Sequence, residues 1–324
     1  MTTPTAARPA TPETLPRAFV GPGLDPARAR GNGFADTRRA FLTATRLGWL
    51  LEANWTDPVL FFIYSIAKPL ASVLILVFMV NVISGGGSAG LRAFVVVGSS
   101  LWSFVFSGVA GLGWAILDDR ERYRMLRYVF VSPSDFVVVI LGRGVARVAV
   151  GLAGAIISLA VGIAFLGVDF DPGRIDWPVL AVAMVLGLWA VIAIGVLIAA
   201  VCIQTRQESW QYPEAVAGAL FLVSGAVFPL SVLPPFAQAV GLISPLSWWM
   251  EGVRRALLPH APSAIGGTTS LFHDLTGAVE PSAATVLLAL SATGVLVTLA
   301  ATLAFRRSER RAKDLGLIDR TTGS

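Results

Sequence analysis

Six apolar blocks of about 19–26 residues run through this sequence, and none of them contains an aspartate or a glutamate. Helices rise by about 1.5 Å per residue, so blocks of this length reach across the roughly 30 Å hydrocarbon core of a bilayer. The chain of 324 residues is 55% hydrophobic and only 14% charged, whereas soluble domains are about 25% charged. The blocks are residues 59–83, 93–117, 148–168, 177–202, 215–233 and 282–305. We therefore expect an all-α integral membrane protein with six transmembrane helices.

The positions of lysine and arginine predict how these helices are oriented. Twenty of the 25 basic residues lie before the first block, between the second and third, between the fourth and fifth, or after the sixth. The opposite side has Arg92, Arg174, Arg254 and Arg255, and one interpretation of the last two is that they are outer-surface charges on a loop helix. Because basic residues accumulate on the cytoplasmic side, we expect a plasma-membrane protein with both termini in the cytoplasm. The net charge of +5 then reflects orientation, and no nucleic-acid partner is expected.

The two ends of the chain differ in composition from the apolar middle. The first 33 residues contain six prolines and no apolar core, which predicts a disordered cytoplasmic tail over residues 1–35. The membrane domain is expected over residues 36–305, followed by a basic cytoplasmic tail over residues 306–324. Within residues 36–55, aromatic and arginine side chains alternate, which is typical of a helix lying flat at the membrane surface. A plain polar lead-in to the first span is the alternative.

The chain stays apolar after the fifth block without reaching the length of another span. Residues 236–243 and 246–258 are too short to cross a bilayer, and prolines bound them. Such stretches indicate re-entrant or interfacial helices. The bounding prolines are Pro229, Pro234, Pro235 and Pro245.

Several motifs of catalysis and energy coupling are absent from the sequence. A phosphate-binding loop needs Gly-Lys-Ser/Thr, but Lys68 precedes Pro69 and Lys313 precedes Asp314. With one cysteine and two histidines, we expect no catalytic residue, no metal and no cofactor. Ion-driven carriers use carboxylates inside the membrane, and the six blocks have none. We therefore expect the energy to come from a separate ATPase. For Lys68 we favour a position at the inner membrane interface over a role in substrate binding.

The segment between the second and third blocks combines charges with apolar residues at helical spacing. Residues 119–130 are expected to form a short amphipathic helix that could seat in a cleft of a cytoplasmic protein. A solvated basic loop that only sets topology is the alternative. The candidate contact residues are Glu121, Arg122, Tyr123, Leu126 and Arg127.

Two motifs in order resemble the type-2 ABC transporter permease family. The first runs from Arg120-Glu121-Arg122 to Ser132-Pro133, and the second from Ser224-Gly225 through Phe228-Pro229 to Pro245-Leu246. Residues 251–255, Glu-Gly-Val-Arg-Arg, also fit the end of the second motif. The resemblance covers residues 120–258 and the six-span layout.

This resemblance implies the membrane subunit of an exporter built from two permease protomers, identical or different, and two ATP-binding subunits. The 119–130 segment would be the coupling helix that contacts the ATP-binding subunit, and the Pro-bounded helices would form an outer lid. The exported substrate would be hydrophobic or amphipathic, such as a drug, an antibiotic, a lipid or a glycolipid. Its path would follow the second and fifth spans, lined by Phe104, Phe106, Phe221 and Phe228.

Two other classes of function stay open at this point. An ion-coupled secondary transporter would need a carboxylate within a span, and the sequence offers none there. An intramembrane enzyme would need a polar constellation inside the spans, which the sequence does not provide either. A passive membrane scaffold is compatible with the residues.

Overall fold

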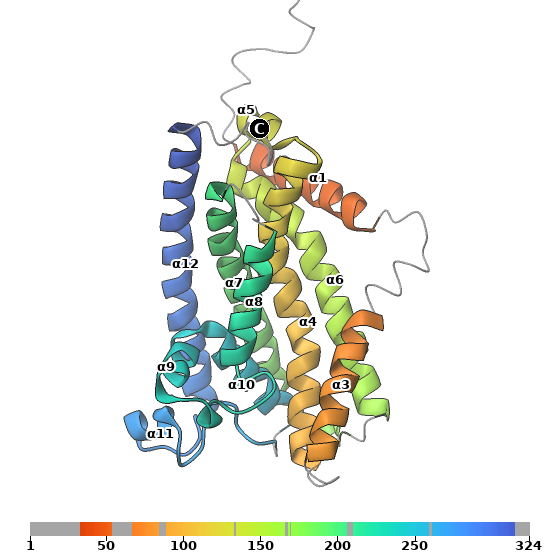
Figure 1. The fold of residues 1–324 in the computed structure, drawn as a ribbon, viewed down its shortest axis with the longest axis vertical. Helices are drawn as coiled ribbons and strands as arrows, with labels where there is room; N and C mark the ends of the chain where they lie inside the picture. Colours follow the sequence, from red (N-terminus) through yellow and green to blue (C-terminus); the bar gives the residue numbers. More distant parts are fainter. Residues whose placement is uncertain are drawn as a thin grey trace, which may run out of the picture.

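The fold is that of a helical bundle whose long helices run side by side (Figure 1). The computed structural model describes residues 33–53, 67–83, 89–132, 134–165, 168, 170–205, 210–258 and 261–314. Within these ranges every regular element is a helix, and no strand occurs. The prediction of an all-α protein is therefore confirmed.

Among the residues that the structure describes, four helices are long and apolar enough to cross a membrane. They are α4 (Ala89–Leu117), α6 (Phe136–Phe165), α7 (Trp177–Gln204) and α12 (Ala283–Asp314). They coincide with the second, third, fourth and sixth apolar blocks, although α6 begins twelve residues before its block. Its first turn is supported by Asp135, whose side chain accepts a hydrogen bond from the amide of Val137 at 2.9 Å.

The fifth apolar block does not form the long helix that its length predicts. Helix α8 (Gln211–Val223) has 13 residues, and the chain turns away at Ser224 instead of continuing to residue 233. The reason is local, because Gly225 adopts a φ of 71°, which L side chains rarely adopt, and Pro229 cannot donate to a helix. The extent predicted for this block was therefore wrong.

The first apolar block is only partly described. Helix α3 (Lys68–Ile83) has 16 residues and covers the second half of that block. Residues 59–66, and the side chains of Lys68 and Pro69, lie outside the described part of the structure. Six spans were predicted, and the described residues contain four helices of spanning length.

Helix α4 occupies the middle of the bundle and contacts α3, α6, α7 and α8. Small residues allow the closest approaches: a Cβ on Gly151 of α6 would meet Ser107, and one on Gly162 would meet Val96. Helix α12 packs on α7 along the opposite side of the bundle. Small residues at such contacts are typical of helices that pack within membranes.

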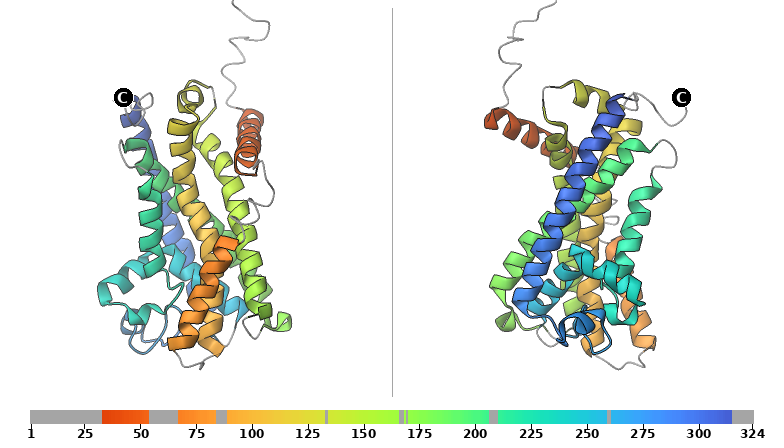
Figure 2. Two further views of the ribbon diagram at one scale, coloured as in Figure 1. Left: turned by 45° about the vertical axis from the view of Figure 1, so that its right-hand side comes forward. Right: turned by 90° about the vertical axis from the view of Figure 1, so that its left-hand side faces the viewer.

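The two ends of the bundle carry different short elements (Figure 2). At the α5 end lie α1 (Phe34–Ala53), α5 (Leu126–Val131) and the last turns of α12. Helix α1 crosses this end and packs on α6, where a Cβ on Gly142 would meet the carbonyl of Phe41. At the opposite α11 end lie α9 (Pro235–Ile243), α10 (Pro245–Leu257) and α11 (Leu271–Thr276).

Helix α10 is almost entirely buried, although it lies in what the sequence marks as a loop region. It packs against α7 and α12 and also contacts α4. The indole of Trp249 fills the space above Gly187 of α7, and the ring of Phe104 lies 5.4 Å from that indole, centroid to centroid. The short helices at the α11 end are thus part of the core.

We predict that Gly187→Ala weakens the fold, because the added methyl group would overlap the ring of Trp249 and displace α10. Overpacking of this kind lowers the free energy of unfolding by about 1–3 kcal/mol. The measurement is thermal unfolding in detergent, followed by tryptophan fluorescence. Gly218→Ala is the matched control, since among the described residues no atom lies within 4 Å of a Cβ at Gly218. Equal unfolding temperatures for the two variants would contradict this account of α10.

Candidate functional site

Helix α4 ends with its apolar block at Leu117, and the chain continues directly into a π-helical turn, η5 (Asp118–Arg122). The chain then reverses at residues 123–125, where Arg124 has a φ of 50°, before α5 begins at Leu126. A non-glycine residue in this region is uncommon and marks a fixed turn. The single helix expected over residues 119–130 is therefore two short pieces joined by a bend.

Buried carboxylates in η5 pair with arginines of α6. The Asp119 carboxylate accepts a hydrogen bond from the guanidinium of Arg143, and the two side chains are only 5% and 4% exposed. Arg147, one turn further along α6, places Nη2 2.6 Å from Asp118 Oδ2 and Nε 3.2 Å from Glu52 Oε2 of α1. These five side chains form one ion-pair cluster that joins α1, α4 and α6.

Arg120 and Glu121 connect the same turn to α7 and α8. Arg120 Nη1 donates to the carbonyls of Cys202 and Thr205, at 3.1 and 2.8 Å, and so satisfies acceptors at the end of α7. Its Nη2 lies 2.8 Å from Glu121 Oε1. Glu121 Oε2 in turn accepts a hydrogen bond from the indole of Trp210 at 3.1 Å. The turn after α4 is thereby bonded to α6, to the end of α7 and to the residue before α8, and Arg147 links it to α1.

The structure separates the predicted coupling residues into exposed and buried ones. Arg122 is exposed and Tyr123 is 36% exposed, and the Arg122 guanidinium carbon lies 5.6 Å from the centre of the Tyr123 ring. Leu126 is only 3% exposed and packs in an apolar cluster that includes Phe136 and Phe305. Glu121 is half-buried, and the side chain of Arg127 lies outside the described part. Arg122 and Tyr123 are therefore the predicted residues available to another protein.

The sequence reasoning missed the residues that hold this segment in place. Arg143 and Arg147 were counted only as topology signals, Asp118 and Asp119 were given no role, and none of the four was predicted to pair. A signal was present, because two adjacent carboxylates end one apolar block and two arginines spaced by four residues precede the next. Arginines with this spacing share one face of a helix and can meet both carboxylates.

At the α11 end the four predicted prolines begin the short helices or their flanking turns. Pro229 precedes the 3₁₀ turn η7 (Leu230–Val232), and Pro234 precedes α9. Pro235 and Pro245 are the first residues of α9 and α10, where the missing amide proton costs nothing. The two short helices thus begin at predicted prolines, and their re-entrant or interfacial placement stays a prediction.

Arg254 of α10 is 2% exposed, so its interpretation as an outer-surface charge was wrong. Its Nη2 donates to the carbonyl of Ala226 at 2.6 Å and its Nε to that of Phe94 at 3.3 Å. The guanidinium carbon also lies 3.6 Å from the centre of the Phe94 ring. Burial lowers the pKa of Arg254 to about 9, and the nearby Glu251 carboxylate opposes this shift. Arg254 thus stays charged at neutral pH and joins α10 to α4 and to the turn after α8.

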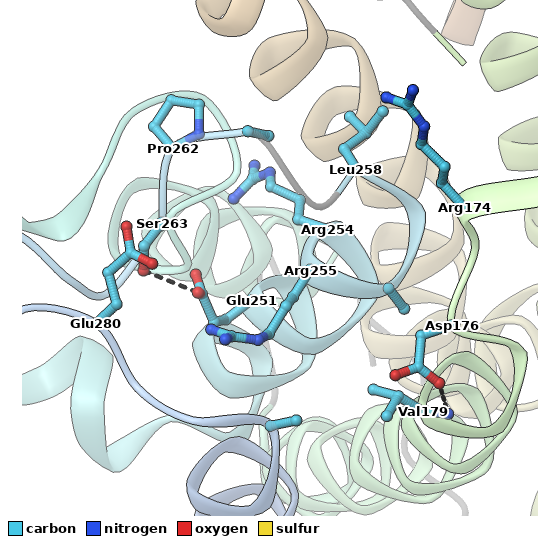
Figure 3. A pocket seen from close by; sticks show the side chains of 13 residues that line it. Arg174, Asp176, Val179, Glu251, Arg254, Arg255, Leu258, Pro262, Ser263 and Glu280 are labelled. Atoms are coloured by element: carbon cyan, nitrogen blue, oxygen red, sulfur yellow. Dashed lines mark hydrogen bonds between the residues drawn. The ribbon is translucent and has the colours of Figure 1, made fainter. Parts of the chain in front are cut away.

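The four phenylalanines expected along a substrate path lie in different surroundings within one chain. Phe104 is buried against Trp249, Phe106 packs on Trp114 with ring centres 5.5 Å apart, and Phe221 packs on Trp102 at 4.8 Å. Phe228 is half-buried in the turn after α8. None of the four lines the cavity of about 340 Å³ that lies beside α10 (Figure 3).

We predict that Arg143→Met strongly destabilises the protein, because it leaves the buried Asp119 carboxylate without its partner. Breaking a buried ion pair in this way costs about 3–5 kcal/mol, whereas replacing both partners by apolar residues is often neutral. Unfolding temperatures of Arg143→Met and of the double variant Arg143→Met/Asp119→Leu test this difference. Arg122→Met, an exposed arginine in the same region, is the control. A double variant as unstable as the single one would argue against the pairing.

Comparison with known proteins agrees with the motifs in the sequence. A family model described as ABC-2 type transporter matches residues 40–258, which is more than half of the chain. A search of curated proteins found no matching sequence. Membrane subunits of this family are transport subunits without catalytic activity of their own, and they normally dimerise and work with an ATP-binding subunit. The matched range and the apolar helices together identify a multi-pass membrane protein that belongs to the ABC-2 type transporter family.

Proposed function

We propose that this chain is the transmembrane permease subunit of an exporter that moves a hydrophobic or amphipathic substrate outward, using ATP hydrolysed by a separate subunit. The substrate class includes drugs, antibiotics, lipids and glycolipids. The observation that carries the proposal is the segment from Asp118 to Val131, which presents Arg122 and Tyr123 at the surface and is bonded to α6 and α7 behind them. A docking segment with rigid support can pass motion from a partner to the spans.

In this mechanism the ATP-binding subunit closes on nucleotide and pushes against the exposed part of η5 and α5. The push reaches α6 through Arg143 and Arg147 and reaches the end of α7 through Arg120. The Asp119–Arg143 pair is buried, so it is screened less by salt than a surface pair would be. Rocking of these helices would alternate the permease between inward-facing and outward-facing states.

The proposed membrane arrangement has six crossings with both termini in the cytoplasm, in the plasma membrane. The α5 end would face the cytoplasm, since α1 and the basic last turns of α12 lie there. Residues 59–66 would complete the first crossing together with α3. The fifth would be made by α8 and the turn after it, and α9 and α10 would form a re-entrant lid. Residues 1–35 and 306–324 would be cytoplasmic tails on a permease domain over residues 36–305.

The substrate path is proposed at the interface of two permease protomers, which are identical or different. Residues of α4 and α8 would line it, including Phe106, Phe221 and Phe228, whereas Phe104, which was also expected there, is buried against Trp249. The exposed apolar residues of α8, Val216 and Leu222, support an apolar partner or substrate on this face. An apolar lining suits a hydrophobic cargo better than a sugar or an ion.

An ion-coupled secondary transporter is the alternative, and the charge arrangement argues against it. Asp118 and Asp119 are the carboxylates nearest to the membrane core in α4 and its extension, and both are paired with arginine. A proton relay needs a carboxylate within the membrane, whereas these two lie in η5, beyond the apolar block of α4. ATP in a partner subunit is therefore the favoured source of energy.

Arg122→Glu and Tyr123→Ala should each reduce co-purification with the ATP-binding subunit about tenfold, because arginine and tyrosine at interfaces often contribute at least 1–2 kcal/mol. The unfolding temperature should not change, since both side chains are exposed. Arg310→Glu, an exposed arginine near the end of α12, is the matched control for charge reversal. If both test variants associate normally with the ATP-binding subunit, then Arg122 and Tyr123 do not form the coupling contact.

Export from proteoliposomes should require ATP and the partner subunit, and it should persist after ionophores collapse ion gradients. A partner whose phosphate-binding lysine is replaced by alanine should support no export, because that lysine contacts the nucleotide phosphates. The measurement is transport of a fluorescent amphipathic compound. Transport driven by an ion gradient without ATP would instead support the secondary transporter.

A further inference from the structure

Helix α12 exposes more of its apolar surface than the other long helices of the bundle. It packs on α7 and α10 along one side of the molecule (Figure 1). Only 22% of its apolar stretch is buried, compared with 33% in α6 and more in α4 and α7. The exposed positions recur every three or four residues and so form one stripe, which is the face that a membrane would cover with lipid. Its large apolar residues, each 47–71% exposed, are Leu288, Val295, Leu296, Leu299 and Leu303.

This exposed stripe of α12 changes from apolar to basic within one turn after Leu303. The next four large exposed residues form what we call the arginine face: Arg306, Arg307, Arg310 and Arg311. At about 100° per residue they fall within an arc of roughly 140°, in line with the exposed leucines. On the opposite, buried side the hydroxyl of Ser308 donates a hydrogen bond to the carbonyl of Ala200 in α7. This bond fixes the rotation of the last turns, so the arginine face is directed away from the bundle.

The fold itself makes little use of these four charges. Among the residues that the structure describes, none of the four arginines has an ion-pair partner. The same turns carry two carboxylates, the half-buried Glu309 and the exposed Asp314, so positive charge predominates. Membrane orientation and the helix dipole both favour basic residues at this end of α12, but neither requires them to share one face. The alignment of the arginine face with the apolar stripe therefore indicates a ligand at the membrane boundary.

The length of α12 places the arginine face at the depth of lipid headgroups. Leu303 lies about 30 Å along the helix from Ala283, which is the thickness of the hydrocarbon core. Arg306 follows about 5 Å further on and Arg310 about 6 Å beyond that, whereas a headgroup layer adds roughly 5–8 Å. Because Cα–Cβ bonds tilt toward the N-terminus of a helix, these side chains lean back toward the membrane. Long arginine side chains can therefore bring all four guanidinium groups into the headgroup layer.

The chemistry of the arginine face matches phosphate. Guanidinium groups bind phosphate oxygens through paired hydrogen bonds, and residues four apart on a helix are neighbours, which makes two rows of two arginines. We propose that the arginine face binds the headgroups of anionic phospholipids in the leaflet at the α5 end, with one phosphate at each row. The proposal requires only that α12 crosses the membrane, and it does not depend on the export function.

Lipid retention by the full chain, without an ATP-binding subunit, tests this proposal. The protein is released from nanodiscs that contain equal amounts of phosphatidylglycerol and phosphatidylcholine, and native mass spectrometry measures how much of each lipid stays bound. The wild type should retain phosphatidylglycerol in preference to phosphatidylcholine, because the face attracts net negative charge. Each arginine of this face replaced by glutamine should reduce that preference about fivefold. Equal retention of the two lipids by the wild type would overturn the proposal.

Two double variants and two controls make the test specific to this face. Arg306→Gln/Arg310→Gln and Arg307→Gln/Arg311→Gln each remove one row, whereas Arg306→Lys/Arg310→Lys keeps both charges and should stay within about twofold of the wild type. Arg124→Gln removes an exposed arginine from the turn before α5 and should leave the preference unchanged. Unfolding temperatures should not differ, because the substituted side chains are exposed.

The remaining outcomes would each count against lipid binding by the arginine face. Wild-type preference in both glutamine double variants would mean that the retained lipid binds elsewhere. A loss in Arg124→Gln as large as that in Arg306→Gln would attribute retention to overall charge. An acidic protein surface is the competing occupant. If the double variants retain lipid normally but lose co-purification with the ATP-binding subunit, this face is a protein contact and the lipid assignment is wrong.

Discussion

Two aspartates end the central helix of this protein, and two arginines on the neighbouring helix neutralise them. The pairs Asp119–Arg143 and Asp118–Arg147 lie where α4 leaves its apolar block, so each charge would be costly without its partner. Because the arginines are spaced by four residues, both pairs form only in one register of α6 against α4. The small residues that bring these helices together further along, such as Gly151, then meet their partners. Apolar packing alone would fix this register less firmly, since lipid tails are as apolar as the helices.

The opposite end is organised by one buried arginine rather than by ion pairs. Arg254 reaches two carbonyls and an aromatic face, and it thereby closes α10 onto α4 and onto the turn after α8. Backbone groups in that turn are not bonded within a helix, so a side-chain donor is needed to satisfy them. The burial of a loop-region helix follows from this requirement and from the contact of Trp249 with Gly187.

The sequence predicted the helices whose boundaries depend on length and apolarity, and it failed where a boundary depends on one residue. Helices α4, α7 and α12 were placed within a few residues at their starts, since an uninterrupted apolar block of that length has few other solutions. The end of α8 could not be read from hydropathy, because Gly225 turns the chain inside an apolar stretch. The pairing of Asp119 with Arg143 spans 24 residues, and Arg254 reaches Phe94 across 160, so only the folded chain brings them together.

Helix α7 connects the two ends of the molecule that the preceding contacts describe separately. Its last carbonyls accept hydrogen bonds from Arg120, and its first half carries Gly187, on which Trp249 of α10 rests. With 28 residues it is about 42 Å long at the usual rise of an α-helix. In the proposed mechanism this helix would tilt as one body and carry a displacement from its contact with Arg120 to its contact with α10.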